Sequence, residues 1–210
     1  MDLWSLQGLL EAWPGRPEER EAWRTFARRA EAALRERAPG HWPGPALVPG
    51  LLQARLAAAL GLAGLTRGDR LRTRVLTLGA HAGLEVRMLR DFGFEAVGLE
   101  QRPELAAAGR DTGLLPPDSL VTADYRAYLA DPGPAWPLIL ALAPEAVDPA
   151  WIATARRRLA PEGQLVVVAY WADLPAAWHS RARPVVEGLM GGLRWEAAPD
   201  SPHSAERQGA

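Results

Sequence analysis

The sequence predicts an α/β fold: a doubly wound, mostly parallel sheet with helices on both faces. From residue 74 onward, short apolar runs alternate with helical segments, which is typical of parallel strands joined by crossover helices. The runs 138–143 and 165–169 are apolar throughout instead of alternating with polar residues, as expected for strands that are covered on both faces. We therefore expect a three-layer α/β/α arrangement.

Length and composition allow one domain with a small N-terminal addition. The chain has 210 residues, of which 48% are hydrophobic, and this is enough for a core of ordinary size. We divide it into an N-terminal helical extension or cap at residues 1–70 and a main domain at residues 71–210. The formal net charge of −1 creates no overall field that would attract nucleic acid or an anionic membrane.

Two helices are predicted in the extension. The first begins at Pro17, which suits the first helical turn, and Glu18 and Glu19 interact favourably with the positive end of the helix dipole. Its apolar residues recur at helical spacing on one face: Trp23, Phe26, Ala27, Ala30 and Leu34. The Pro- and Gly-rich stretch 38–50 ends this helix, and a second helix follows over about 50–65.

The main domain is predicted to begin with a strand at 75–79. The elements expected after it are a helix at 84–92, a strand at 94–100, a helix at 103–113, strands at 119–125 and 137–143, a helix at 148–163 and a strand at 164–171. Gly93 suits a left-handed C-cap for the first of these helices. Asp148, followed by Pro149, is the expected N-cap of the last one.

The junction after the first strand, "GAHAG", is almost free of side chains apart from His81. In a doubly wound sheet the ligand crevice lies beyond the carboxyl ends of the strands. Gly79 allows a tight turn and a close approach of a ligand to the backbone, and a helix beginning near Gly83 presents unpaired amide groups. The junction fits a nucleotide-like ligand, although two glycines also suit a plain turn between strand and helix.

Acidic residues end the next two strands. Glu100 lies roughly 20 residues after the glycine turn, where a carboxylate accepts hydrogen bonds from both hydroxyls of a ribose. Asp124 ends the third strand and is placed to meet the amine of a base. Each acid alone is also consistent with a solvated strand end, but their common position on one sheet edge favours nucleotide binding.

Over about residues 74–172 these segments resemble the class I S-adenosylmethionine-dependent methyltransferases. Residues 75–83, "VLTLGAHAG", are similar to the family's first motif, in which a strand runs into a G-x-G-x-G loop. Residues 159–165, "LAPEGQL", are similar to its L-x-P-G-G-x-L turn. The resemblance implies a Rossmann-like, seven-stranded sheet whose last strand runs antiparallel, with residues 193–200 and those after 203 supplying the final hairpin.

The resemblance also implies an activity and a cofactor. We expect a methyltransferase that uses S-adenosylmethionine and a small-molecule acceptor, with the N-terminal helices capping the pocket. Glu100 matches the acid that binds the cofactor ribose, and Asp124 matches the acid that holds the adenine amine. The expected cofactor-binding residues are Gly79, Ala80, His81, Gly83, Glu100, Asp124, Tyr125 and Ala143.

The acceptor side of the pocket is less defined by the sequence. Five residues near or just beyond strand ends are candidates for shaping it, with Trp171 the best placed: Tyr125, Tyr170, Trp171, Asp173 and His179. No catalytic base is assigned and no metal site is expected.

Two residues depart from the family's first motif. Thr77 stands where an acid usually precedes the first glycine by two positions, and His81 replaces the middle glycine. The missing acid ordinarily orders this loop and the methionine amine. The imidazole of His81 adds bulk close to the expected cofactor, unless its ring points outward, and it is also able to hydrogen-bond the cofactor carboxylate or a substrate.

The sequence leaves three alternatives to methyl transfer. The two departures favour a catalytically inactive relative that keeps the fold as a binding or scaffold protein. A dinucleotide-binding oxidoreductase needs glycines at the positions of His81 and Leu84, so it is disfavoured. Local nucleic-acid contact rests only on one charge cluster and is not expected: Arg67, Arg70, Arg72 and Arg74.

Missing residue types exclude further chemistry. The chain has no cysteine, so a thiol nucleophile, a disulfide or a thiolate metal site is impossible, and it has no lysine for a Schiff base or a phosphate loop. Its first residues lack the pattern of a secretory signal, and the apolar run 47–65 is interrupted and too short to span a bilayer securely. A cytoplasmic protein without a membrane segment is expected.

Overall fold

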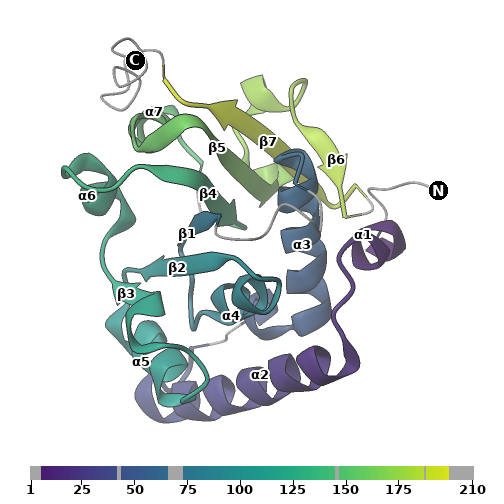
Figure 1. Ribbon diagram of the computed structural model, residues 1–210, viewed down its shortest axis with the longest axis vertical. Helices are drawn as coiled ribbons and strands as arrows, with labels where there is room; N and C mark the ends of the chain where they lie inside the picture. The colour runs from purple at the N-terminus through teal and green to yellow at the C-terminus, as the bar shows by residue number, and fades with distance from the viewer. Residues whose placement is uncertain (1–5, 42–43, 66–72, 145–146, 187, 199–210) are drawn as a thin grey trace.

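The computed structural model describes residues 6–41, 44–65, 73–144, 147–186 and 188–198 (Figure 1). They form one seven-stranded sheet with the order β3-β2-β1-β4-β5-β7-β6. The strands are β1 (Arg74–Leu78), β2 (Glu95–Glu100), β3 (Leu120–Thr122), β4 (Trp136–Leu142), β5 (Leu159–Tyr170), β6 (Arg183–Val185) and β7 (Met190–Glu196). Strands β1 to β5 pair in parallel, and β7 runs antiparallel to β5 and β6. The expected doubly wound, mostly parallel sheet with an antiparallel last strand is confirmed.

Helices cover both faces of this sheet. They are α1 (Leu6–Ala12), α2 (Pro17–Arg37), α3 (Pro49–Leu62), α4 (Leu84–Asp91), α5 (Pro103–Asp111), α6 (Tyr125–Ala130) and α7 (Pro149–Arg157). Short 3₁₀ turns lie at η1 (Gly44–Leu47), η2 (Pro117–Ser119), η3 (Trp171–Asp173) and η4 (Ala176–Trp178). Residues of α1 to α5 share one apolar cluster, while those of α6 and α7 belong to a second. Two helical layers therefore enclose the sheet.

The central strands supply side chains to both clusters. In β4, Leu138 and Leu140 pack with the first cluster, while Ile139 and Ala141 pack with the second. Successive side chains of a strand point to opposite faces, so a strand covered on both sides must be apolar at every position. This is the physical reason for the uninterrupted apolar run in this part of the sequence.

The N-terminal helices pack directly on the sheet domain. Helix α2 crosses α4 and α5, whereas α3 contacts α4 and the strands β4, β5 and β7 (Figure 1). Phe26 and Leu34 of α2 and Leu56 of α3 are fully buried or nearly so in the first cluster. The helices α1, α2 and α3 and one face of the sheet consequently share a single apolar core.

The third predicted strand is shorter than expected because a helix follows it. We predicted a strand at 119–125, but β3 ends at Thr122 and α6 begins at Tyr125. The Asp124 carboxylate accepts hydrogen bonds from the amides of Arg126 and Ala127, which caps the new helix. Helix α6 was not predicted, since its six residues are too few to show a helical period.

The seventh helix ends earlier than predicted. Helix α7 stops at Arg157, and β5 already begins at Leu159, where it pairs with Trp136 before a shift in register. Glu162 adopts a left-handed conformation with φ of 65° within this turn. As predicted, Asp148 caps α7, by accepting from the amides of Ala150 and Trp151.

The final hairpin differs from the expectation. Residues 193–196 lie in β7 as predicted, and its hairpin partner among the described residues is β6, at residues 183–185. Gly188, with φ of 79°, allows the turn between them. The segment after residue 203, which was expected to complete the hairpin, lies outside the described residues, as does all of 199–210. Within the described residues, no helix combines the length and apolarity that crossing a membrane requires.

Candidate functional site

A cavity of about 490 Å³ opens at the carboxyl ends of the central strands. Strands β1, β2, β4 and β5 contribute Leu78, Glu100, Leu142 and Tyr170 to its walls. Because β1 and β4 are neighbours, the cavity lies where the strand order changes direction, which is the usual ligand site of an open α/β sheet. Its volume falls within the range of small-molecule sites.

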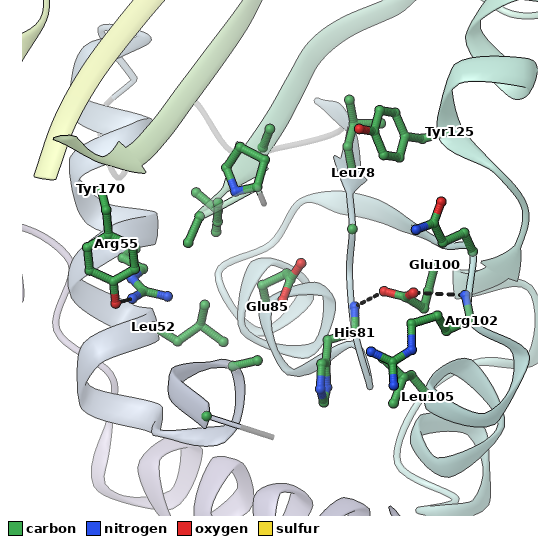
Figure 2. A pocket seen from close by; sticks show the side chains of 18 of the residues that line it. Leu52, Arg55, Leu78, His81, Glu85, Glu100, Arg102, Leu105, Tyr125 and Tyr170 are labelled. Atoms are coloured by element: carbon green, nitrogen blue, oxygen red, sulfur yellow. Dashed lines mark hydrogen bonds between the residues drawn. The ribbon is translucent and has the colours of Figure 1, made fainter. Parts of the chain in front are cut away.

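The N-terminal part of the chain forms another wall. Helix α3 supplies Leu52 and Arg55, η1 supplies Gly44 and Ala46, and His41 follows α2. Figure 2 shows Arg55 and Tyr170 on one side of the cavity, Glu100 and Tyr125 on the other, and Glu85 and His81 between these sides. A ligand in this space contacts both the sheet edge and the N-terminal helices.

Glu100 is held at the end of β2 by two backbone amides. Its carboxylate accepts hydrogen bonds from the amide of His81 at 2.7 Å and from the amide of Arg102 at 2.9 Å (Figure 2). The side chain is only 6% exposed, yet it lines the cavity. Each carboxylate oxygen has two lone pairs, so further hydrogen bonds can be accepted from a ligand.

The backbone around the cavity includes several left-handed residues. Gly79 has φ of 71°, and a side chain added there would meet no other atom within 4 Å. His81 and Ala143 have φ of 49° and 52°, which residues with a Cβ rarely adopt. Such residues concentrate at functional sites. The open space over Gly79 lets a ligand approach the main chain.

The ring of His81 is part of a short hydrogen-bonded chain. Its Nε2 lies 3.0 Å from Nε2 of His41, whose Nδ1 lies 3.0 Å from a guanidinium nitrogen of Arg102. Arginine is only a donor, so His41 Nδ1 accepts and its Nε2 carries the hydrogen that points to His81. Burial, and then the electrostatic repulsion that His41 and Arg102 would exert on a protonated ring, lower the pKa of His81 to about 4. His81 is therefore uncharged at neutral pH.

Glu85, in the first turn of α4, places a second carboxyl group at the cavity. Its side chain is buried, and burial is the main reason why its pKa rises to about 8. Its own backbone amide opposes this rise, the charge of Glu100 adds to it, and the Thr77 hydroxyl and Arg55 oppose it. Residue 77 is a threonine and not the acid that the family's first motif has there, but the carboxyl of Glu85 reaches the same region from α4.

Arg55 and Tyr170 form a polar pair in the opposite wall. The Arg55 guanidinium donates a hydrogen bond to the Tyr170 hydroxyl and lies 5.1 Å from the centre of its ring (Figure 2). The side chain of Arg55 is 3% exposed, and burial lowers the pKa of its guanidinium. This cation remains in a mostly apolar environment, since Leu52 and Leu56 beside it in α3 are buried too.

Five of the eight predicted cofactor-binding residues line the cavity: Gly79, His81, Glu100, Tyr125 and Ala143. The other three, Ala80, Gly83 and Asp124, do not line it. The Ala80 side chain is fully buried, and Gly83 lies against Leu115 and Leu120.

Asp124 has a structural role in this conformation. One of its oxygens caps α6, and its side chain lies at the exposed end of the sheet. An interaction between Asp124 and the amine of a base remains a prediction.

The predicted acceptor-side residues divide in the same way. Tyr125 and Tyr170 line the cavity, whereas Trp171, Asp173 and His179 do not. Trp171 donates from its indole to the Gly188 carbonyl, and the ring of His179 packs edge-on against it. The expectation that Trp171 shapes the pocket is therefore wrong for this cavity.

Four ionisable residues that line the cavity were not predicted from the sequence: His41, Arg55, Glu85 and Arg102. One of them left a signal, because Arg55 is a charge in the middle of an otherwise apolar helix. The others come from ordinary polar surroundings, where the pattern does not distinguish a cavity residue from a solvated one.

The arginine cluster lies mostly outside the described residues, which exclude Arg67, Arg70 and Arg72. Arg74 is described, and its guanidinium lies 4.5 Å from the centre of the Trp136 ring. Nothing in the described part connects this cluster with the cavity.

No protein-family model and no curated protein matches the sequence. Among solved structures, an S-adenosylmethionine-dependent methyltransferase from Agrobacterium tumefaciens superimposes with a TM-score of 0.52 at 15% identity, over 70% of this chain and 63% of that one. A substituted form of the protein MtNAS, solved in complex with S-adenosylmethionine, superimposes with a TM-score of 0.55 at 14% identity, over 94% of this chain and 86% of that one.

The chain has the class I methyltransferase fold. Strand order, the antiparallel seventh strand and the position of the cavity agree with this assignment. The chain spans less than two thirds of the length of the Agrobacterium methyltransferase, so the likeness concerns the common fold.

Proposed function

We propose that this methyltransferase-fold protein binds S-adenosylmethionine and transfers its methyl group to a small-molecule acceptor. The observation that carries the proposal is the Glu100 carboxylate, which is oriented by two amides at the carboxyl end of β2 and borders the cavity. A carboxylate in this position is suited to the two hydroxyls of a ribose.

The residues present fit an adenosyl group. Gly79 leaves open space beside the backbone, and Glu100 retains acceptor capacity on both oxygens. Leu78, Leu105 and Trp151 provide apolar surface for a base. We expect Glu100 to hold the ribose, the Gly79 backbone to lie against the cofactor, and the apolar side chains to pack on the adenine.

The chemistry requires little from the protein beyond alignment. When bound, S-adenosylmethionine supplies a methyl group made electrophilic by the adjacent sulfonium. The chain binds the two reactants, orients them and excludes water, and these effects alone lower a barrier substantially. Walls from both α3 and the sheet edge suit the exclusion of water and favour a small acceptor over a macromolecular one.

Calorimetry with S-adenosylmethionine and S-adenosylhomocysteine tests the proposal. Both are expected to bind the wild type, and Glu100→Gln is expected to weaken them by about 10- to 100-fold, because a charged hydrogen-bond acceptor contributes about 1.5–3 kcal/mol. Glu95→Gln is the matched control, since Glu95 begins the same strand at its opposite, exposed end. NAD is the negative control and is not expected to bind.

Failure of both adenosyl compounds to bind would overturn the cofactor assignment. It would favour the alternative, a protein that keeps the fold as a binding or scaffold module. Binding without methylation of any acceptor would leave a cofactor-binding but inactive relative.

A further inference from the structure

Arg55 is a buried cation that forms no ion pair with any described residue. Among the residues that the structure describes, no carboxylate lies within ion-pair distance of its guanidinium, and its buried Nε has no hydrogen-bond partner. Within the described part of the chain, its one hydrogen bond is to the Tyr170 hydroxyl, at the cavity wall. A buried charge without an opposite charge is costly, so its retention in an apolar helix calls for an explanation.

A second buried arginine shows how this chain satisfies a structural guanidinium. Arg158 is similarly buried and its Nε also has no hydrogen-bond partner, but its two terminal nitrogens donate to the backbone carbonyls of Tyr128, Asp131 and Pro134. These hydrogen bonds connect α6 and the loop after it to the C-cap of α7, just before β5 begins. Among the described residues Arg55 has a single acceptor, the Tyr170 oxygen, although the two arginines are buried to a similar degree.

The two acids that line the same cavity do not neutralise Arg55. Burial raises the pKa of Glu85 to about 8, so that this carboxyl is mostly uncharged at pH 7. Glu100 is held by the amides of His81 and Arg102 on the other side of the cavity (Figure 2). The positive charge of Arg55 is therefore available to a ligand.

Tyr170 adds a second donor to this charge. Arginine only donates, so the Tyr170 oxygen accepts from Arg55, and its own hydroxyl hydrogen remains for another acceptor. A guanidinium and a hydroxyl that converge on one cavity wall match the two oxygens of a carboxylate.

We propose that Arg55 and Tyr170 form a carboxylate-binding subsite, which shares the cavity with the adenosyl site assigned to Glu100. The adenosyl site beside this subsite rests on the proposed function. The binding of a carboxylate by Arg55 and Tyr170 does not depend on it. The carboxylate belongs either to the amino-acid end of the cofactor or to the methyl acceptor, and binding experiments distinguish these sources.

The test compares wild-type protein with Arg55→Met and Tyr170→Phe by calorimetry. The probes are S-adenosylhomocysteine, which has a carboxylate, and 5′-methylthioadenosine, which lacks it, and acetate is then titrated into protein saturated with either compound. Arg194→Met is the matched control, because it removes one positive charge from the exposed face of β7.

If the subsite holds the cofactor carboxylate, Arg55→Met weakens S-adenosylhomocysteine by about 10- to 100-fold and leaves 5′-methylthioadenosine unchanged. If it holds the acceptor, both adenosyl compounds bind the variant normally, but millimolar acetate binds only the wild type. Tyr170→Phe shifts the same measurement in the same direction by about 3- to 10-fold. Arg194→Met changes none of these affinities.

Equal binding of all three probes by wild type and both variants would overturn the subsite. Failure of the proposed function gives a different result. If neither adenosyl compound binds the wild type, the cofactor assignment is wrong, but acetate added to the free protein still tests whether Arg55 binds a carboxylate. Arg55→Met is expected to fold, because removing an uncompensated buried charge is neutral or stabilising. If Arg55→Met does not fold, Tyr170→Phe still tests the subsite, because this variant keeps the Arg55 guanidinium and removes only the Tyr170 hydroxyl.

Discussion

Glu85 shows at the scale of one residue how burial changes chemistry. Its pKa of about 8 lies above the ordinary value of 4.5, so the folded state binds a proton that the unfolded state releases between these pH values. The stability that Glu85 contributes is fully present below pH 4.5 and is lost as the pH rises through about 8. The slope is about 1.4 kcal/mol per pH unit at most.

Glu85→Gln is therefore expected to remove a pH dependence. The variant cannot ionise at this position, so its free energy of unfolding should fall less than that of the wild type between pH 6.5 and 8. Urea denaturation at several pH values measures the difference between the two proteins. Parallel pH profiles would show that the carboxyl is ionised in the folded state throughout.

His81 limits the range in which this effect is visible. Its pKa is lowered from 6.5 to about 4, so its contribution to stability has the opposite sign: it is lost as the pH falls from 6.5 to 4. From pH 4.5 to 6.5 the two groups oppose each other. The interval above 6.5 isolates Glu85.

The sequence predicted only some of the individual residues that line the cavity. Glu100 and Gly79 were found because a strand end and a turn have a fixed relation to the sheet edge. Arg55 and His41 come from the N-terminal region, and they reach the cavity only because α3 and the segment after α2 fold over it. No local pattern contains that long-range contact.

At the scale of elements, helix α5 packs closely against the turn between β1 and α4, at Ala82. A Cβ added to Gly109 would lie 2.1 Å from the carbonyl oxygen of Ala82 and 2.8 Å from a Leu120 methyl group. Glycine at this position therefore lets the helix approach the loop that borders the cavity. The close approach connects helix packing with the shape of the site.

Gly109→Ala is expected to destabilise the protein by about 1–3 kcal/mol, the usual effect of overpacking against atoms that cannot move freely. Gly50→Ala is the control: it lies in the first turn of α3, where an added Cβ meets nothing within 4 Å, and it should stabilise by about 0.5 kcal/mol. Thermal unfolding compares both variants with the wild type. Similar effects for both would contradict the packing argument.

Element prediction succeeded where patterns were long and failed where they were short. The helices at 17–37 and 49–62 and the central strands were predicted because period and apolarity extend over many residues. Helix α6 and strand β6 have six and three residues. Their positions depend on the Asp124 cap and on pairing with β7, neither of which is a periodic signal.

At the scale of the whole molecule, the N-terminal helices and the sheet form one core. Leu34 of α2, Leu56 of α3, Val75 of β1 and Val166 of β5 belong to the same buried cluster. The division at residue 70 remains a proposal about the sequence. Shared burial makes independent folding of the two parts unfavourable, because separating them would expose this apolar surface.

The intact protein is therefore expected to unfold as a single cooperative unit. Hydrogen exchange followed by mass spectrometry should give similar protection for the central amides of α3 and for those of β1 and β4, since all of them open only on global unfolding. S-adenosylhomocysteine at 100 times its dissociation constant should slow exchange in α3 and the strands alike, by the equivalent of about 2.7 kcal/mol. Much faster exchange of α3 than of the strands, with or without ligand, would instead identify the N-terminal part as a separately folding cap over the cavity.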